Sequence, residues 1–407
     1  SCLSDDCIEQ RSYTRFDPIY MTSFEFRIDI QTESLRSLEN PGRMYFYEDY
    51  LFINEKGLGI HIYDNSDRNN PSFVTFYKIP GNFDISIKDG YLVADNVIDL
   101  ITVDIQDINN PVIIDRIKDF MGRYINWEDE PNRVYWAYSV ASPIKEVINC
   151  SDANFGFNDF WRGEVFFTTD LDIGSVVNSE TSGGGSTGSV GIGGSTSRFT
   201  IIGNYLYIVD NYNLLTFEFQ SGSVPILRAT NNLGWGIETI YPFQDKLFIG
   251  STSGMHIYSI SNPESPTRIS TFQHARACDP VVVKDDKAYV TLRDGRLCDG
   301  FLNQLDVIDI SDITDPTLIK SYSMKNPNGM TFKDNILFLS ESSFGLKALD
   351  ITDSQNIKEL LWNKEISSTD LIYLGDNTLM SIGATGFYQY DVSDIEDMKQ
   401  ISYIPVQ

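Results

Sequence analysis

Long hydrophobic runs are missing from this sequence. No stretch approaches the ~20 apolar residues that a transmembrane helix needs, so we expect any link to a membrane to be a lipid. Basic residues are also scarce. The sequence has 31 Lys and Arg against 57 Asp and Glu, which gives a formal net charge of −26. That charge repels phosphate backbones and anionic headgroups, so we predict no nucleic-acid partner.

Recognisable catalytic and cofactor motifs are missing too. The sequence has no HExxH, CxxC or P-loop pattern, and no GxSxG elbow between a strand and a helix. His61 and His256 occupy matching strand positions, which leaves His274 as the one histidine in a predicted loop. The Gly-rich stretch 183–194 lacks the flanking strand-to-helix switch of a phosphate-binding loop, so we interpret it as a flexible insert. We therefore predict no catalytic residue, no metal and no cofactor.

Cysteines are few, and their number is odd. The chain starts Ser-Cys-Leu-Ser-Asp-Asp, which resembles what remains of a lipoprotein after its leader is cleaved, so we expect Cys2 to be lipidated. The acidic residues behind it resemble signals for the outer face of the outer membrane, which predicts a cell-surface location. The other four cysteines allow three pairings, and from their positions we favour Cys278–Cys298 and Cys7–Cys150.

What the sequence does contain is a repeat of strands. Tyr and Phe number 22 and 25, which favours an all-β fold. Eight short apolar runs align at steps of 41, 42, 72, 41, 41, 49 and 42 residues, counted from equivalent positions. The runs are YLFINEKG (50–57), YLVADN (91–96), RVYWAYS (133–139), YLYIVDN (205–211), KLFIGST (246–252), KAYVTLRDG (287–295), ILFLSES (336–342) and TLMSIGAT (378–385).

A second alternating strand follows most runs and ends in an acidic turn, as in LDVIDISDITDP (305–316). With a further strand before and after, each unit holds four strands in about 41 residues, which is typical of a propeller blade. We predict an all-β propeller of eight four-stranded blades. Because the third unit is degenerate, seven blades with an elaborated insertion at 121–198 stay open as the alternative.

The period and the LDVIDISDITDP pattern resemble the LVIVD-repeat family of bacterial β-propellers, from Pro41 to Val406. Segments such as NPGRMYFYEDYLFINEKG (40–57) and HARACDP (274–280) are similar to surface lipoproteins of that family, which have no assigned chemistry. The resemblance implies a fold and a location. We divide the chain into a lipoprotein tether and cap (1–40) and one propeller domain (41–407) with an insertion at 171–198.

A local site in a propeller is expected at the mouth of the central channel, where the loops between blades meet. Polar and aromatic candidates for ligand binding in these loops are Arg43, Asp84, Trp235, His274, Arg276, Asp279 and Arg293. We predict a non-catalytic surface module that binds or scaffolds a glycan, a peptide or a surface protein. The alternative is a polysaccharide hydrolase or lyase that uses carboxylates at the channel mouth.

Overall fold

A computed structural model describes residues 8–120, 133–149, 189–274, 280–293 and 303–407. The chain divides into two compact units, one of residues 1–27 with 122–172 and one of residues 28–121 with 173–407. Within the described ranges, no helix has the length and apolar character needed to cross a membrane.

The first unit contains a long two-stranded antiparallel sheet. Strand β1 (Ile8–Thr22) pairs with β11 (Arg133–Asn149), and the register shifts twice along the pair. One shift lies beside Pro143, as expected for a residue that cannot donate to the ladder. The short helix α1 (Ser23–Phe26) follows β1 and begins with a capping box between Thr22 and Glu25.

The expected third blade does not form, and this corrects the prediction of eight blades. The run RVYWAYS (133–139) belongs to β11, which is 17 residues long and pairs with β1. The segment contains Ser142-Pro143, yet it continues through a register shift as one strand instead of folding back on itself. The alternative of seven blades with an elaborated insertion is confirmed by the sheets of the second unit.

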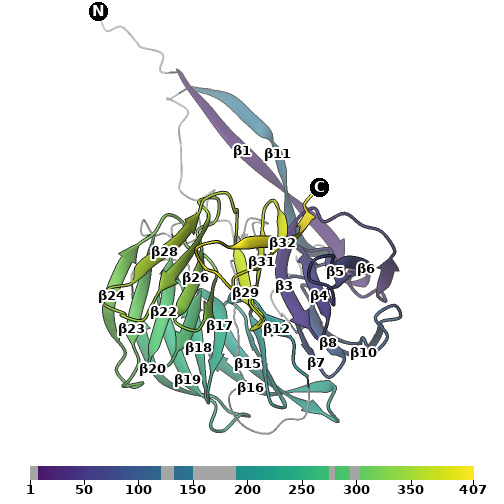
Figure 1. The fold of residues 1–407 in the computed structure, drawn as a ribbon. Coiled ribbons are helices and arrows are strands. Elements are labelled where there is room, and N and C mark those ends of the chain that lie inside the picture. The colour runs from purple at the N-terminus through teal and green to yellow at the C-terminus, as the bar shows by residue number, and fades with distance from the viewer. Residues whose placement is uncertain (1–7, 121–132, 150–188, 275–279, 294–302) are drawn as a thin grey trace, which may run out of the picture. The chain divides into compact units, whose positions relative to one another are not determined.

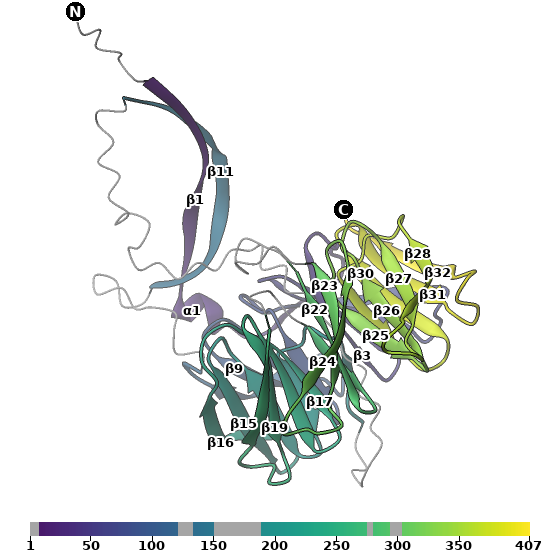
Figure 2. The ribbon, with the colours of Figure 1, turned by 90° about the vertical axis from the view of Figure 1, so that its left-hand side faces the viewer.

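The second unit, as far as it is described, is a propeller of seven blades (Figures 1 and 2). Blade 1 contains β3 (Pro41–Tyr47), β4 (Tyr50–Glu55), β5 (Gly59–Asp64) and β6 (Ser72–Lys78), with β2 (Gln31–Glu33) on its outer edge and β12 (Ile192–Gly193) on its inner edge. Blade 2 contains β7 (Ile85–Lys88), β8 (Tyr91–Asp95), β9 (Leu100–Asp104) and β10 (Val112–Ile117). Blade 3 contains β13 (Phe199–Ile202), β14 (Tyr205–Val209), β15 (Asn213–Gln220) and β16 (Val224–Asn232).

The remaining four blades each contain four consecutive strands. Blade 4 contains β17 (Ile237–Phe243), β18 (Lys246–Ser251), β19 (Gly254–Ser259) and β20 (Thr267–Gln273). Blade 5 contains β21 (Val281–Lys284), β22 (Lys287–Leu292), β23 (Gln304–Asp309) and β24 (Thr317–Ser323). Blade 6 contains β25 (Met330–Lys333), β26 (Ile336–Ser340), β27 (Leu346–Asp350) and β28 (Lys358–Asn363). Blade 7 contains β29 (Asp370–Tyr373), β30 (Thr378–Gly383), β31 (Gly386–Asp391) and β32 (Lys399–Pro405).

The blades share one design, which follows from their sequence pattern. The second strand is buried along most of its length because its side chains pack against both neighbouring blades, whereas the fourth strand alternates or is largely exposed. Between the third and fourth strands of every described blade the register shifts by one residue, a β-bulge that increases twist. The acidic turn after the third strand is closed by side chains such as Asp350, which accepts the N–H of Thr352 at 2.9 Å.

The ring closes between blades 1 and 7 without exchange of a blade strand. Apolar side chains of both blades form a single core cluster there. Asn65 of blade 1 and Gln389 of blade 7 donate to each other's side-chain oxygens at 2.9 and 2.8 Å, and both are fully buried. Leu38 also forms a parallel bridge with Val406, which follows the last strand of blade 7.

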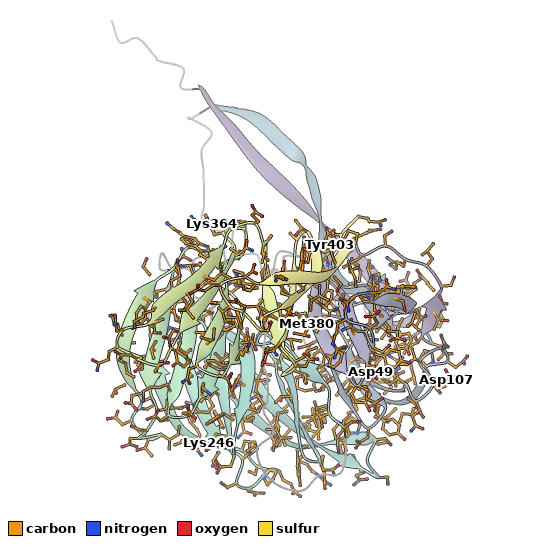
Figure 3. All side chains as sticks on the ribbon, in the orientation of Figure 1. Asp49, Asp107, Lys246, Lys364, Met380 and Tyr403 are labelled. Atoms are coloured by element: carbon orange, nitrogen blue, oxygen red, sulfur yellow. The ribbon has the colours of Figure 1, made fainter. Side chains whose placement is uncertain are left out.

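The antiparallel order gives the propeller two distinct faces. We call the end with the inter-blade loops and the turns between second and third strands the loop face. The other end, with the turns that join first to second and third to fourth strands, is the turn face. Figure 3 shows Lys364 and Tyr403 along the loop face and Lys246 along the turn face.

Candidate functional site

The chain itself occupies the central channel around which the mouth candidates lie. Residues 189–198, which we call the plug, run from the turn face to the loop face along the inner edges of blades 1 and 2 (Figure 1). Val190 bridges Lys88, the Gly191 N–H donates to the Ile87 carbonyl at 2.8 Å, and β12 pairs with β3.

The plug also contacts blades further round the ring. The Met330 N–H of blade 6 donates to the Ser195 hydroxyl at 3.3 Å. The Ile240 N–H of blade 4 donates to the Ser197 carbonyl at 3.2 Å. Gly194 lies against the Asp370 carboxylate of blade 7. Hydrogen bonds and close packing therefore tie this backbone to the inner strands of blades 1, 2, 4, 6 and 7.

Glycine is required in the plug because the neighbouring side chains leave no room for a Cβ. A Cβ at Gly193 would overlap the Tyr45 ring, and one at Gly194 would overlap the Asp370 carboxylate. The interpretation of 183–194 as a flexible insert is therefore wrong for its last residues, which are packed. Residues 183–188 lie outside the described part of the chain.

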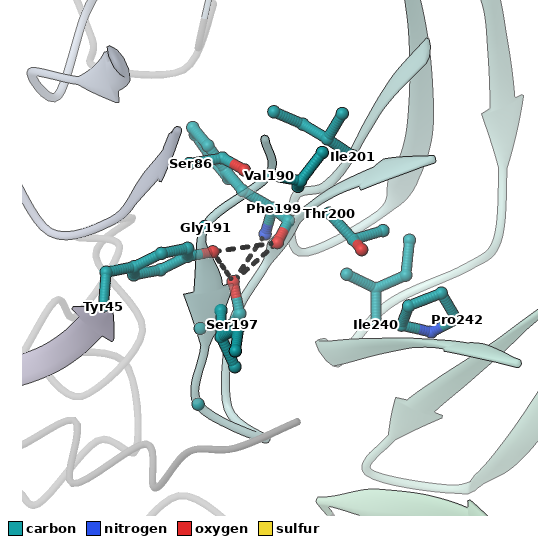
Figure 4. Close-up of a pocket in the computed structure, with 13 residues that line it drawn as sticks. Tyr45, Ser86, Val190, Gly191, Ser197, Phe199, Thr200, Ile201, Ile240 and Pro242 are labelled. Carbon is teal, nitrogen blue, oxygen red and sulfur yellow. Dashed lines mark hydrogen bonds between the residues drawn. The ribbon is translucent and has the colours of Figure 1, made fainter. Parts of the chain in front are cut away.

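Figure 4 shows a small cavity beside the plug. Its volume is about 30 Å³, roughly the space of one water molecule. The Tyr45 hydroxyl forms a hydrogen bond with the Ser197 hydroxyl at 2.9 Å and donates to the Phe199 carbonyl at 3.2 Å. Burial raises the pKa of Tyr45 far above its usual value, so the phenol stays neutral. A cavity of this size is too small for an organic ligand.

Two of the predicted mouth residues, Arg43 and Asp84, contact each other beside the plug. Their side chains are 3.4 Å apart and almost completely buried. Arg43 also donates to the carbonyls of Thr196 at 2.9 Å and Phe83 at 3.1 Å. The Asp84 carboxylate accepts the N–H of Arg198 at 2.7 Å. Both side chains thus hold the end of the plug against blades 1 and 2.

Burial away from water is the largest influence on the pKa values of the carboxylates beside the plug. Burial raises the pKa of Asp84, although Arg43 and the backbone N–H groups of Arg198 and Ile85 act in the opposite direction. Burial likewise raises the pKa of Asp95 to about 6, against hydrogen bonds from the N–H groups of Phe83 and Asp84. These carboxylates face protein groups, not a cavity open to substrate.

Carboxylates at the ends of second strands have a repeated role that the sequence reasoning did not identify. The Glu341 carboxylate accepts the N–H groups of Lys325 and Asn326, each at 2.8 Å. Glu55 accepts those of Glu39 and Asn40 in the same way. Each therefore fastens the inter-blade loop that precedes its blade. The signal in the sequence was a Glu four residues before Gly59 and Gly345.

Each of these glutamates has a buried cationic or imidazole partner at the same repeat position. His61 Nε2 lies 3.0 Å from Glu55, and Lys347 Nζ lies 3.0 Å from Glu341. Burial raises the pKa of Glu55, but hydrogen bonds from His61 and the two backbone N–H groups outweigh it, so the net pKa is lowered. The mouth carboxylates are structural acceptors in this arrangement.

The other predicted site residues of the described part of the chain lie in separate loops of blades 3 to 5. Trp235 is 62% exposed in the loop between blades 3 and 4. His274 follows blade 4 and is partly buried. Arg293, just after the second strand of blade 5, is 8% exposed, and its Nε has no hydrogen-bond partner among the described residues. Arg276 and Asp279 lie outside the described residues, so a ligand contact at any of these five stays a prediction.

The five cysteines also lie outside the described residues, so lipidation of Cys2 and the pairings Cys278–Cys298 and Cys7–Cys150 stay predictions. Among described side chains, no group of three His, Cys, Asp or Glu has a metal-binding arrangement.

Comparison with solved structures gives several matches. A computationally designed protein, Ika8, matches with a TM-score of 0.50 at 9% identity, over 91% of this chain and 90% of that chain. BamB from Moraxella catarrhalis matches with a TM-score of 0.49 at 8% identity, over 94% and 97%. A functionally unknown protein from Desulfotomaculum acetoxidans matches with a TM-score of 0.48 at 9% identity, over 89% and 95%. At such identities the likeness concerns the fold alone.

Comparison of the sequence with curated proteins gives no significant match. The model of the LVIVD repeat matches residues 193–217 and 275–324. These ranges include strands of blades 3 and 5, which have the four-stranded form of the other blades. The repeat match and the seven described blades together identify the chain as an LVIVD-repeat β-propeller.

Proposed function

We propose that this propeller is a non-catalytic binding or scaffolding module that a lipid on Cys2 holds at the outer face of the outer membrane. The observation that carries the proposal is the plug. It fills the channel with backbone, and Asp84, Glu55 and Glu341 at the mouth are bonded to backbone N–H groups. Acid–base catalysis needs carboxylates within reach of a bound substrate, and these three are committed to protein partners.

We therefore expect binding at the outer loops and turns of the rigid ring. Loops held by a rigid scaffold are the usual location of binding residues. The net charge of −26 keeps anionic partners away, which favours neutral or basic ones. A neutral glycan, a peptide or another surface protein fits this description.

One experiment separates a binding module from an enzyme. Envelope polysaccharide from the source cells is mixed with the purified protein, and both co-sedimentation and release of new sugar ends are measured. We expect association without turnover. Turnover that disappears on Asp84→Asn or Glu341→Gln, in variants that melt like wild type, would favour the hydrolase or lyase instead.

The location is tested separately. Cells grown with a labelled fatty acid should transfer the label to the wild-type protein and not to a Cys2→Ser variant. Protease added to intact cells should degrade the wild-type protein. Absence of label, or protection from protease, would contradict surface display.

A further inference from the structure

A second concave region lies on the turn face, away from the channel mouth. It is a cleft of about 590 Å³ between blades 1 and 2, within the ~300–1,000 Å³ range of small-molecule sites. It is lined by the first turn of blade 1 (47–50), the first turn of blade 2 (89–90), the acidic turn of blade 2 (105–109) and Ser189, where the plug begins. Figure 3 labels Asp49 and Asp107 on this side of the propeller.

The walls of the cleft are fixed by specific contacts. The Tyr47 hydroxyl accepts the Gly90 N–H at 2.9 Å and forms a hydrogen bond with the Ser189 hydroxyl at 2.7 Å. Gly90 has a φ of +78°, and a Cβ there would lie 2.9 Å from the Gln106 side chain. The Tyr77 hydroxyl donates to the Ile108 carbonyl at 2.6 Å, which anchors the acidic turn. The cleft is therefore preformed.

The lining offers both hydrogen-bond acceptors and donors. Carboxylates of Glu48, Asp89 and Asp107 accept, whereas the amides of Gln106 and Asn109 both donate and accept. The half-buried Tyr50 adds a hydroxyl and an aromatic face. A sugar hydroxyl also donates and accepts at once, and a sugar ring presents C–H groups that suit an aromatic surface.

Other ligand classes fit this lining less well. Three carboxylates repel an anionic ligand. A simple cation would use the acceptors alone, and all three already have partners. Glu48 accepts from Ser189 Oγ at 3.3 Å, Asp89 lies 3.5 Å from Lys88 Nζ, and Asp107 accepts from Asn109 N and Asn110 Nδ2 at 3.0 and 2.8 Å. We propose that the cleft binds a neutral saccharide unit of a glycan. This inference rests on the proposed binding function and names its site and ligand class.

The test uses the full chain on an array of neutral, amino and acidic oligosaccharides, followed by calorimetry with the strongest neutral ligand. We expect neutral glycans to bind. Gln106→Ala and Tyr50→Ala should each weaken binding roughly tenfold, because each removes a hydrogen bond or a contact surface at the ligand. Thr352→Ala is the matched control, since Thr352 occupies the position of Gln106 in the acidic turn of blade 6 and does not line the cleft.

Melting temperatures of all three variants show whether they remain folded. The cleft proposal is wrong if only charged glycans bind, if no glycan binds, or if both cleft variants bind a neutral glycan like wild type. Envelope polysaccharide that still co-sediments with the cleft variants would leave the binding module standing and move its site elsewhere. Loss of all co-sedimentation, with wild type as well, would overturn the proposed function itself.

Discussion

Buried carboxylates in this propeller accept hydrogen bonds from neighbouring backbone N–H groups. Asp95 accepts the N–H groups of Phe83 and Asp84 at 2.7 and 3.0 Å, and both bonds use the same carboxylate oxygen. An asparagine oxygen can accept the same bonds, so the charge of Asp95 is dispensable for the contact. Because burial raises its pKa to about 6, that charge disfavours the folded state at neutral pH.

We therefore expect Asp95→Asn to become more stable relative to wild type as the pH rises. The neutral carboxyl of the folded chain contributes stability that is fully present below its ordinary pKa near 4 and is lost as the pH rises through about 6. Urea unfolding at pH 4 and pH 7 should show the difference between variant and wild type grow by up to about 3 kcal/mol. An unchanged difference would contradict the burial of Asp95.

Asp107→Asn is the control, and its stability relative to wild type should change with pH in the opposite direction. Hydrogen bonds from Asn110 and Asn109 lower the pKa of Asp107, which is exposed. Its ionised form therefore contributes stability above the ordinary pKa, and this contribution is lost as the pH falls through the lowered pKa. The variant should lose stability relative to wild type as the pH rises.

The sequence suggested Arg43 and Asp84 as ligand-binding residues at the channel mouth, and that role stays a prediction. The structure shows the two side chains in contact with each other. Their partners, the Thr196 carbonyl and the Arg198 N–H, are backbone groups about 115 to 155 residues away, and no side-chain pattern announces such groups.

The plug is the element that distinguishes this propeller from an open ring. Its glycines permit a backbone to pass between the inner strands, and Gly193 lies against the Tyr45 ring. Gly191 differs, since a Cβ there would meet its neighbours at 3.4 Å, near ordinary contact. The two residues therefore form a matched pair for substitution.

Gly193→Ala should destabilise the protein by about 1–3 kcal/mol, because the added methyl group forces Tyr45 or the plug to shift. Gly191→Ala should destabilise the protein clearly less than Gly193→Ala does. Urea unfolding of both variants measures the difference. Equal effects would mean that residue 193 does not pack against Tyr45.

The sequence pattern predicts where strands lie better than it predicts which strand each one pairs with. Repeat spacing predicted the second strand of all seven blades, and the acidic turns predicted the third strand of six, because these strands carry their own pattern of burial and turn residues. Residues 133–149 imitate a blade strand in composition but pair with β1, a partner about 125 residues earlier. Strand pairing at that separation depends on tertiary contacts and is invisible to local pattern.

The whole ring depends on one closure between its first and last blades. There the buried amides of Asn65 and Gln389 satisfy each other, and Gln389 also donates to Ser402 at 2.9 Å. Removing one amide leaves the other buried without this partner. That loss should lower the free energy of unfolding by more than the removal of both amides.

A double-mutant cycle of Asn65→Ala and Gln389→Ala tests this closure. We expect each single variant to lose about 1–3 kcal/mol, with a coupling energy above about 0.5 kcal/mol. Unfolding free energies of the two single variants and the double variant give the coupling. Additive losses would show that the two blades do not meet through this pair.

The propeller's channel is filled by its own chain. Hydrogen exchange followed by mass spectrometry of a peptide covering 189–198 tests it most directly, with β14 (Tyr205–Val209) as a protected reference and the exposed acidic turn at 107–110 as a fast one. The plug amides, such as Gly191 bonded to Ile87, should exchange as slowly as β14. Exchange as fast as the acidic turn would mean an open channel and would return the mouth residues to consideration as a ligand site.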